Sequence, residues 1–341
     1  ERLKYYMKHA LEVSPEHPIL IDKFLEDAIE VDVDAISDGN TVTIGGVMEH
    51  IEEAGIHSGD SACSLPAFSL APETIDEIKK QTCALAKELN VIGLINIQFA
   101  VQNEEVFIIE VNPRASRTIP FVSKAIGVPL AKVAARVMAG KSLKEIGFTK
   151  EVKFSHIAVK ESVFPFNKFT DVDVLLGPEM KSTGEVMGID KTFGRAFAKS
   201  QLATGIKLPL SGTAFISVKD SDKPKTVKIA QGLLELGYRI LATSGTAEHL
   251  NKNDVTVESI NKVKEGSPHC VEGIESGEIN LVINTVFGEQ AIKDSFSLRR
   301  SSLNQNLPYC TTISGASALL GALKALKEED LNITTIQEYN N

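Results

Sequence analysis

Oxygen-bearing side chains and two arginines stand close together in the stretch from residue 95 to residue 117. Two apolar runs flank a short polar tetrad there, which predicts a β-hairpin. If the hairpin is symmetric about Glu104, Gln98 lies opposite Glu110. Because strand side chains alternate between faces, Asn112 shares the face of Glu110. We therefore expect three oxygen donors to converge on one point.

Oxygen ligands of this kind suit Mg²⁺, which proteins hold through one or two carboxylates while substrate phosphates and waters complete the octahedron. Arg114 and Arg117 follow directly, and guanidinium groups can hold phosphate oxygens or offset the charge that develops during phosphoryl transfer. The simpler interpretation is that Gln98, Glu110 and Asn112 are ordinary polar positions on a half-exposed hairpin. Their joint occurrence on otherwise apolar strands favours a site for ATP-dependent, magnesium-assisted transfer.

The composition is that of a globular protein with 341 residues, 43% hydrophobic and 24% charged, which is long enough for two or three domains. A net charge of −9 argues against broad nucleic-acid binding, and no apolar run is long enough to span a bilayer. We therefore expect neither nucleic acid nor a membrane as partner. The four cysteines show no paired spacing, which favours reduced thiols in the cytoplasm over zinc or disulfides.

The beginning of the chain predicts a helix followed by strands. An amphipathic helix is expected over residues 1–13, and the missing initiator Met indicates a fragment whose upstream part is absent. A strand is expected over residues 19–27. The next strand carries acidic side chains at alternating positions, Glu30, Asp32 and Asp34, which puts them on one face. The simplest expectation for Asp32 and Asp34 is a solvated strand face.

Loops and helices alternate after these strands. A hairpin turn is expected at residues 38–40. Residues 49–66 are rich in small and polar side chains, and such a loop offers amides and hydroxyls to a ligand, so it is a candidate wall of a nucleotide pocket. Helices are expected over residues 75–89 and around residues 130–137. The glycine-punctuated stretch 177–188 follows no phosphate-loop spacing and predicts tight turns between strands.

From Gly212 strands and helices alternate, which predicts a parallel sheet covered on both faces, with a helix over residues 290–303 and strands that include 309–313. Ligands of such sheets bind beyond the carboxyl ends of the strands. The residues there are Ser217, Thr243-Ser244-Gly245-Thr246, Asn284-Thr285 and Thr311-Thr312. With Lys223 and Lys262 nearby, they predict a site for a phosphate-bearing small molecule. The alternative is that these hydroxyls only cap helices, but their repetition favours binding.

Three long motifs carry a family resemblance: EVFIIEVNPRASRTIPFVSKAIGVPLAKVAARVMAG, EHIEEAGIHSGDSACSLP and LGPEMKSTGEVMG. Together they resemble the large subunit of glutamine-dependent carbamoyl phosphate synthetases, in the C-terminal part of its second ATP-grasp unit. The last part of the chain resembles the methylglyoxal-synthase-like allosteric domain of that subunit. The resemblance implies an α/β and α+β fold. It divides the chain into a partial ATP-grasp domain (1–200), a linker (201–211) and a doubly wound parallel-sheet domain (212–341).

The resemblance implies roles for individual residues. Gln98, Glu110 and Asn112 would hold the divalent ions, Mg²⁺ or Mn²⁺, that bridge the ATP phosphates, and Arg114 and Arg117 would serve the reacting phosphate. The remaining ATP contacts implied are Lys23 and Leu25 near adenine through their backbone, Glu30 on the ribose hydroxyls, and the loop Gly55, Ile56, His57 and Ser58. In the intact enzyme this unit would phosphorylate carbamate to carbamoyl phosphate for pyrimidine and arginine supply, with ammonia from a separate glutaminase subunit.

Two effector sites are also implied by the resemblance. Positions that bind a pyrimidine nucleotide, usually UMP, correspond to Ser217, Lys223, Thr243, Gly245, Thr246, Lys262, Asn284 and Ser295. Positions linked in some members with the activator ornithine correspond to Glu52, Asp60, Glu161, Tyr309 and Thr311. Because these positions lie on both sides of the domain junction, an effector could bias the ATP site through them.

The chain also departs from the family pattern. The upstream half of the ATP-grasp fold, with its flexible loop over the phosphates, is absent from the sequence, so we expect this chain alone to be inactive. The sequence NTVFGE stands where methylglyoxal synthases carry an acidic motif, which fits binding rather than enolisation. One alternative is a nucleotide-sensing module without catalysis. Another, a biotin carboxylase-like ligase, has no support after residue 200. Self-association is a further possibility that the sequence leaves open.

Overall fold

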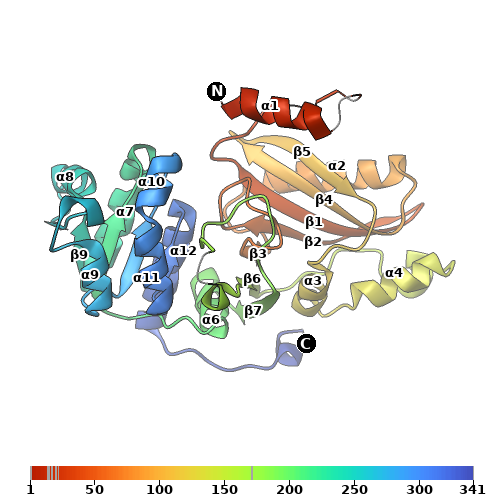
Figure 1. Cartoon of the computed structure of the whole chain (residues 1–341). Helices are drawn as coiled ribbons and strands as arrows, with labels where there is room; N and C mark the ends of the chain where they lie inside the picture. Colours follow the sequence, from red (N-terminus) through yellow and green to blue (C-terminus); the bar gives the residue numbers. More distant parts are fainter. Residues whose placement is uncertain are drawn as a thin grey trace.

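Two β-sheets organise the chain, as Figure 1 shows. The computed structural model describes residues 2–13, 16, 18–19, 21, 23–169 and 172–340. One sheet has seven strands in the order β5-β4-β1-β2-β3-β6-β7, and the other has five in the order β10-β9-β8-β11-β12. No helix in the described ranges is both long and apolar enough to cross a bilayer.

The first sheet is antiparallel at every strand pair. Its strands are β1 (Ile29–Asp38), β2 (Val42–His50), β3 (Cys63–Leu65), β4 (Ile92–Gln102), β5 (Glu105–Asn112), β6 (Ile157–Val163) and β7 (Gly184–Asp190). The hairpin between β1 and β2 confirms the turn predicted at residues 38–40, where the Asp38 amide donates to the Thr41 carbonyl at 3.1 Å. The strand β3 lies inside the stretch 49–66, which is therefore only partly a loop.

Helices cover both faces of the first sheet. They are α2 (Pro72–Glu88), α3 (Ile119–Ile126), α4 (Leu130–Met138), α5 (Leu143–Ile146), the 3₁₀ turn η1 (Phe166–Lys168) and α6 (Phe193–Ala203). Val31 and Val33 of β1 pack in one core with α2, whereas Ile36 on the other face packs in a second core with α3 and α4. Because side chains alternate along β1, Val31 and Val33 are buried on one face of the sheet, and Asp32 and Asp34 lie on the opposite face.

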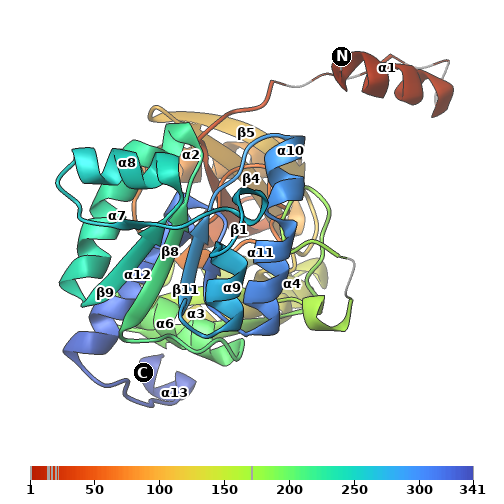
Figure 2. The ribbon, with the colours of Figure 1, turned by 60° about the vertical axis from the view of Figure 1, so that its left-hand side comes forward.

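The first helix, α1 (Arg2–Val13), confirms the helix predicted at this end of the chain. Figure 2 shows that α1 stands away from the two sheets, and Leu3, Tyr5 and Tyr6 are exposed on it. The strand predicted over residues 19–27 is wrong for the described part of that range, which has no strand. The strand β1 that follows it is paired with β2 on one side and β4 on the other, so this segment cannot form a hairpin with β1.

The second sheet is parallel and confirms the architecture predicted from Gly212 onward. Its strands are β8 (Gly212–Ser217), β9 (Tyr238–Ala242), β10 (Glu258–Ser259), β11 (Leu281–Asn284) and β12 (Tyr309–Cys310). Its helices are α7 (Lys223–Glu235), α8 (Ser244–Lys252), α9 (Cys270–Glu275), α10 (Glu289–Asp294), α11 (Phe296–Asn304) and α12 (Ile313–Glu328), with the turns η2 (Asp220–Asp222) and η3 (Val263–Glu265). Residues of α7 and α12 pack on one face, and residues of α9 and α11 pack on the other.

Two local predictions for this sheet are wrong. The helix expected over residues 290–303 is interrupted at Ser295, so α10 and α11 are separate. The strand expected over residues 309–313 ends at Cys310. Thr312 instead caps α12, because its hydroxyl oxygen accepts the Gly315 amide at 3.0 Å.

The two sheets share a hydrophobic core. Phe197 of α6 and Val159 of β6 belong to the same buried cluster as Ile216 of β8 and Leu319 of α12. After α12 the chain returns to the first sheet through α13 (Ile336–Tyr339), which Figure 2 shows below α6. Of the predicted linker 201–211, the first three residues belong to α6, and residues 204–211 have no regular secondary structure. The domain limits themselves stay a prediction.

Candidate functional site

A cleft of about 690 Å³ lies on the polar part of the first sheet. It brings together most of the residues predicted for metal, phosphate and nucleotide: Glu30, Gly55, Ile56, His57, Ser58, Gln98, Glu110, Asn112, Arg114 and Arg117. These residues come from β1, β4, β5 and the loops that follow β2 and β5. Their individual roles stay predictions, but their common location is a property of the fold.

The register of the β4–β5 hairpin places Gln98 opposite Glu110, as predicted. The turn, however, is not centred on Glu104. It consists of Asn103 and Glu104, which both have left-handed backbone angles, φ 51° and 67°, as a two-residue hairpin turn requires. A bulge between Gln98 and Phe99 shifts the register by one residue and restores the predicted pairing.

Two rows of polar side chains cross the three strands β1, β4 and β5. Asp32 pairs with Gln98, which pairs with Glu110. The second row consists of Asp34, Asn96 and Asn112. Directly opposed side chains on neighbouring strands lie about 5 Å apart, so each row presents a line of oxygen atoms. Asp32 and Asp34 are only 2% and 0% exposed, and the expectation of a solvated strand face is wrong for both.

Asp34 fixes the loop that carries the two arginines. Its carboxylate accepts hydrogen bonds from the Asn96 amide at 3.0 Å, the Ser116 hydroxyl at 2.7 Å and the Thr118 hydroxyl at 2.5 Å. Burial raises the pKa of Asp34 to about 6, and these hydrogen bonds oppose the increase. The sequence did not predict that Asp34 positions this loop. The one indication in the sequence is that Asp34 is two residues from Asp32, which places both carboxylates on the same face of the strand.

The loop after β2 forms a second wall of the cleft and is held by its neighbours. The Gly55 amide donates to Glu30 Oε1 at 2.9 Å, and Gln98 Nε2 donates to Ser58 Oγ at 3.1 Å. The His57 amide donates to the Gly177 carbonyl at 2.8 Å. The loop therefore contacts both the predicted ribose-binding carboxylate and the predicted metal ligand.

His50 lies buried between two acidic side chains at this edge of the cleft. Its Nε2 is 3.1 Å from Asp32 Oδ2, and its Nδ1 is 3.3 Å from Glu30 Oε2. Burial by itself lowers the pKa of His50, but Cys63, Asp32 and Glu30 raise it well above its ordinary value. Glu30 is therefore oriented from two directions, by His50 and by the Gly55 amide.

Lys23 and Leu25 do not line this cleft. Lys23 is exposed and Leu25 is half-buried, in a segment without regular secondary structure. Phe24 between them lies against the loop, because a Cβ atom placed on Gly55 would stand 2.8 Å from the Phe24 ring. The segment around Phe24 therefore lies next to the loop that contains Gly55. The backbone contacts of Lys23 and Leu25 to adenine stay a prediction.

The donor set of the cleft fits a divalent ion that phosphate oxygens also bind. Glu110 is the carboxylate of the predicted set, and Gln98 and Asn112 supply amide oxygens. In the described part of the chain no group of three His, Cys, Asp or Glu side chains could hold a metal ion. A site with so few charged ligands depends on substrate phosphates to complete the coordination, as magnesium sites commonly do.

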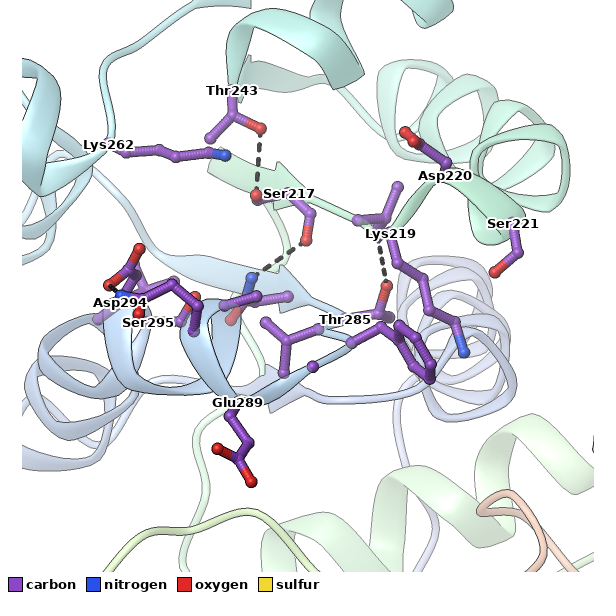
Figure 3. A pocket seen from close by; sticks show the side chains of 18 of the residues that line it. Ser217, Lys219, Asp220, Ser221, Thr243, Lys262, Thr285, Glu289, Asp294 and Ser295 are labelled. Atoms are coloured by element: carbon purple, nitrogen blue, oxygen red, sulfur yellow. Dashed lines mark hydrogen bonds between the residues drawn. The ribbon is translucent and has the colours of Figure 1, made fainter. Parts of the chain in front are cut away.

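A larger cavity of about 1410 Å³ lies at the carboxyl ends of β8, β9 and β11. Five of the residues predicted for the nucleotide effector line it: Ser217, Thr243, Lys262, Asn284 and Ser295. In Figure 3 the Lys262 side chain points toward Thr243 and Ser217. Thr243 Oγ1 donates to Ser217 Oγ at 3.1 Å, and Asn284 Nδ2 donates to the Ser217 carbonyl at 3.1 Å. The cavity therefore presents hydroxyls from successive strand ends, with the ammonium group of Lys262 close to them.

The other three predicted effector residues lie beside this cavity and do not line it. Thr246 is buried, and its Oγ1 accepts the Val218 amide at 3.3 Å. Lys223 Nζ pairs with Asp220 Oδ1 at 2.7 Å. A Cβ atom on Gly245 would stand 3.4 Å from that same Lys223 Nζ. Of the three, Thr246 contacts the end of β8, through its hydrogen bond with Val218.

A third cavity, of about 250 Å³, lies between the two sheets. Glu52, Glu161, Tyr309 and Thr311, four of the residues predicted for ornithine, line it. Asp60 does not, because its carboxylate accepts the backbone amides of residues 181 and 182 at 2.8 and 2.9 Å. Burial raises the pKa of Glu52 to about 7 and that of Glu161 to about 8. This cavity is a suitable environment for a cationic ligand, which would stabilise both carboxylates.

Replacing Glu161 by Gln is expected to stabilise the protein at pH 8 and to have little effect at pH 5. The pKa of Glu161 is higher in the folded state than in the unfolded state, so the unfolded state loses its proton first as pH rises. Folding therefore becomes less favourable between about pH 4.5 and pH 8. Gln cannot ionise and keeps an acceptor for Gln201, which donates to Glu161 at 2.6 Å.

Urea unfolding at the two pH values measures this effect, which we expect to be on the order of 2 kcal/mol at pH 8. Glu88→Gln, at an exposed position at the end of α2, is the control and should change stability by less than about 0.5 kcal/mol at either pH. An equal effect of Glu161→Gln at pH 5 and pH 8 would contradict the predicted titration.

Comparison with known proteins agrees with the two regions of the structure. Residues 1–146 match the family of carbamoyl-phosphate synthase L chain ATP binding domains, and residues 225–311 match the MGS-like domain family. The carbamoyl phosphate synthase large chain of Myxococcus xanthus is 56% identical over 338 residues, which is 99% of this chain and 31% of that protein. The large chain of Archaeoglobus fulgidus is 53% identical over 341 residues, or 100% of this chain and 32% of that protein.

Among solved structures, the chain is similar to the biotin carboxylase domain of a thermophilic 2-oxoglutarate carboxylase bound to bicarbonate. That similarity has 15% identity and a TM-score of 0.46, and it covers 59% of this chain and 51% of that one. At this level no conclusion about function rests on it.

The antiparallel sheet with its polar cleft and the parallel sheet with its cavity define an ATP-binding domain followed by an MGS-like domain. With about 55% identity over essentially its whole length, the chain corresponds to the C-terminal portion of the carbamoyl phosphate synthase large chain. It spans about a third of the length of the relatives it matches.

Proposed function

We propose that the cleft on the first sheet belongs to the site at which the intact synthase phosphorylates carbamate with ATP. The supporting observation is the pairing of Gln98 with Glu110, which places the carboxylate and the amide oxygens in rows across three strands. Gln98, Glu110 and Asn112 would hold a divalent ion there, Mg²⁺ or Mn²⁺, which would neutralise the charge of the ATP phosphates. Arg114 and Arg117, which line the same cleft, bind oxygens of the transferred phosphoryl group.

In this proposal the protein positions the reactants and stabilises charge. An oxygen of carbamate attacks the terminal phosphorus of ATP, and ADP leaves. Glu30, oriented by His50 and the Gly55 amide, binds the ribose hydroxyls. The loop that contains His57 and Ser58 covers the nucleotide and limits the access of water. The hydrogen bonds from Ser116 and Thr118 to Asp34 keep the loop with both arginines in place during transfer.

The test is the reverse reaction, in which the full-length synthase that contains this chain forms ATP from MgADP and carbamoyl phosphate. We expect ATP formation that depends on Mg²⁺ or Mn²⁺. Absence of that reaction in a folded full-length protein would contradict the proposed function. We expect the 341-residue chain alone to be inactive, because it spans only about a third of its relatives.

We further propose that the cavity at the second sheet binds a pyrimidine nucleotide, with UMP as the first ligand to test. Lys262, Thr243 and Ser217 supply an ammonium group and hydroxyls for the phosphate. The alternative, a nucleotide-sensing module without catalysis, shares this cavity but predicts no ATP formation in the full-length protein. The third cavity is the proposed site of ornithine, whose amino groups match Glu52 and Glu161.

Replacing Lys262 by Ala is expected to weaken UMP binding at least tenfold, because the charge-assisted hydrogen bond to the phosphate is lost. Thr246→Ala should also weaken it, since the Val218 amide then loses its hydroxyl acceptor behind the cavity. Titration calorimetry of the chain measures both. Lys252→Ala, at an exposed lysine of α8, is the control and should stay within twofold of the wild type. UMP binding that neither Lys262→Ala nor Thr246→Ala changes would rule out this location.

The family also suggests the setting in which the chain works. We propose that the intact large chain pairs with a small glutaminase chain, which supplies ammonia, and that the assembly operates in the cytoplasm in pyrimidine and arginine supply.

A further inference from the structure

Lys160 is a buried lysine in the middle of β6 that the proposed chemistry has not yet used. Its side chain is 1% exposed and is among the largest fully buried side chains of the described chain. It nevertheless lines the cleft on the first sheet, together with Arg114 and Arg117. The cleft is therefore bordered by a third cation, which comes from a strand of the sheet, whereas the two arginines lie in a loop.

The hydrogen bonds of Lys160 leave part of its donor capacity unused. Its Nζ donates to the Ser58 carbonyl at 3.2 Å, whereas an ammonium group has three hydrogens to donate. Among the described residues, no carboxylate lies within the 4 Å of an ion pair with Nζ. The contact with Ser58 directs the ammonium group toward the loop that carries His57, and hence toward the predicted nucleotide phosphates.

An ammonium group buried without a charged partner is costly to the folded protein. Glu52 and Glu161 feel the charge of Lys160, but they line the third cavity and form no ion pair with it. The charge of Lys160 lowers the pKa of both carboxyls, yet burial keeps them raised to about 7 and about 8. Four carboxylates line the same cleft, those of Glu30, Asp32, Glu110 and Glu185, but none of them forms an ion pair with Lys160. The substrates proposed for the cleft carry the negative charge that could approach its ammonium group.

We propose that Lys160 is a substrate-binding residue of the cleft, whose ammonium group holds an anionic oxygen of the carbamate or phosphoryl group opposite the row Asp32, Gln98 and Glu110. The ligand class is a small oxyanion. In the reaction, Lys160 and the two arginines surround the transferred group on the side away from the metal ligands, so that negative charge is balanced on both sides. This inference rests on the proposed function of the cleft.

The test uses the full-length synthase with Lys160→Met, Lys160→Arg and the control Lys153→Met. Lys153 is exposed and precedes β6 by four residues. In ATP formation from MgADP and carbamoyl phosphate, we expect Lys160→Met to raise KM for carbamoyl phosphate at least tenfold and to leave KM for MgADP within twofold. Lys160→Arg should recover most of the loss, because it keeps the charge. Lys153→Met should match the wild type.

Binding provides a second measurement that does not depend on turnover. In a Lys262→Ala background, which weakens anion binding in the effector cavity, inorganic phosphate should raise the thermal unfolding midpoint with Lys160 present and should fail to do so with Lys160→Met.

Two outcomes would overturn the inference while leaving the proposed function standing. One is a wild-type KM for carbamoyl phosphate in Lys160→Met. The other is an equal rise of both KM values together with a lower unfolding midpoint, which would mean that Lys160 only supports the fold. If the wild-type synthase itself formed no ATP, the proposed function would fail instead.

Discussion

Replacing Glu110 by Gln should lower ATP formation from MgADP and carbamoyl phosphate by about 1000-fold in the full-length synthase. Among Gln98, Glu110 and Asn112, only Glu110 carries a charge, and Gln keeps its shape while removing that charge. A 1000-fold loss corresponds to about 4 kcal/mol of transition-state stabilisation, which is within the range of a single group that acts on developing charge. The concentration of Mg²⁺ that gives half-maximal rate should rise as well, because one ligand is weakened.

The matched control is Glu105→Gln. Glu105 lies on the same strand as Glu110, but it stands next to the turn, is exposed and does not line the cleft. Its replacement should leave the rate within twofold, which separates the loss of a metal ligand from a general change of charge on β5. A Glu110→Gln protein that kept more than a tenth of the wild-type rate would show that the carboxylate is not essential, and the assignment of the row would then be wrong.

The candidate site could be predicted from the sequence wherever the geometry is local. Gln98, Glu110 and Asn112 belong to one hairpin, so alternation and a short turn are enough to place them on one face. Even there, the prediction of a symmetric turn at Glu104 was wrong, and a bulge at Gln98 produced the predicted pair.

The rest of the site depends on contacts between distant parts of the chain. Asp34 lies 62 residues from Asn96 and 84 from Thr118, and the pairing of β1 with β4 and of β4 with β5 brings them together. The strand pattern shows that Asp34 shares a face with Asp32, but it does not show that this face is covered. Lys160 illustrates the same limit, because a single lysine in an apolar strand carries no signal of the cleft it borders.

The parallel sheet was predicted as a whole, because alternating strands and helices have few other arrangements. Its relation to the first sheet was not. Phe197 and Ile216 lie on either side of the predicted linker but belong to one buried cluster. The hydrophobic pattern of a helix or strand shows which of its faces is buried, but it does not show whether that face packs within its own domain or against the other domain. The proposed communication between the larger cavity and the cleft would therefore depend on contacts that the sequence pattern does not show.

One such contact is the buried ion pair between Arg299 of α11 and Asp173, in the segment that precedes β7. Arg299 is 1% exposed, and its Nε donates to Asp173 Oδ1 at 2.6 Å, while Nη2 donates to the Ile292 carbonyl at 2.8 Å. The same segment continues to Gly177, whose carbonyl accepts the His57 amide in the cleft. The ion pair therefore joins α11, which borders the larger cavity through Leu298, to the loop that carries His57 in the cleft.

Replacing Asp173 by Ala should lower the free energy of unfolding by about 3–5 kcal/mol, because it leaves the guanidinium of Arg299 buried without its carboxylate. Arg299 Nη1 already lacks a hydrogen-bond partner among the described residues. Without Asp173, Nε would lose its partner as well. Urea unfolding measures the loss. The exposed pair of Lys264 with Asp294 is the control, and Lys264→Ala should cost less than about 1 kcal/mol.

The double replacement Asp173→Ala with Arg299→Met distinguishes an unpaired charge from lost packing. Met fills the space of the arginine stem and removes the charge, so the double variant should recover most of the stability that Asp173→Ala loses. It should not restore the connection between the two sites. We therefore expect UMP to bind the full-length double variant with nearly wild-type affinity and to have a weaker effect on ATP formation. If the double variant were as unstable as Asp173→Ala alone, the cost would come from the altered segment, and the ion pair would not be its cause.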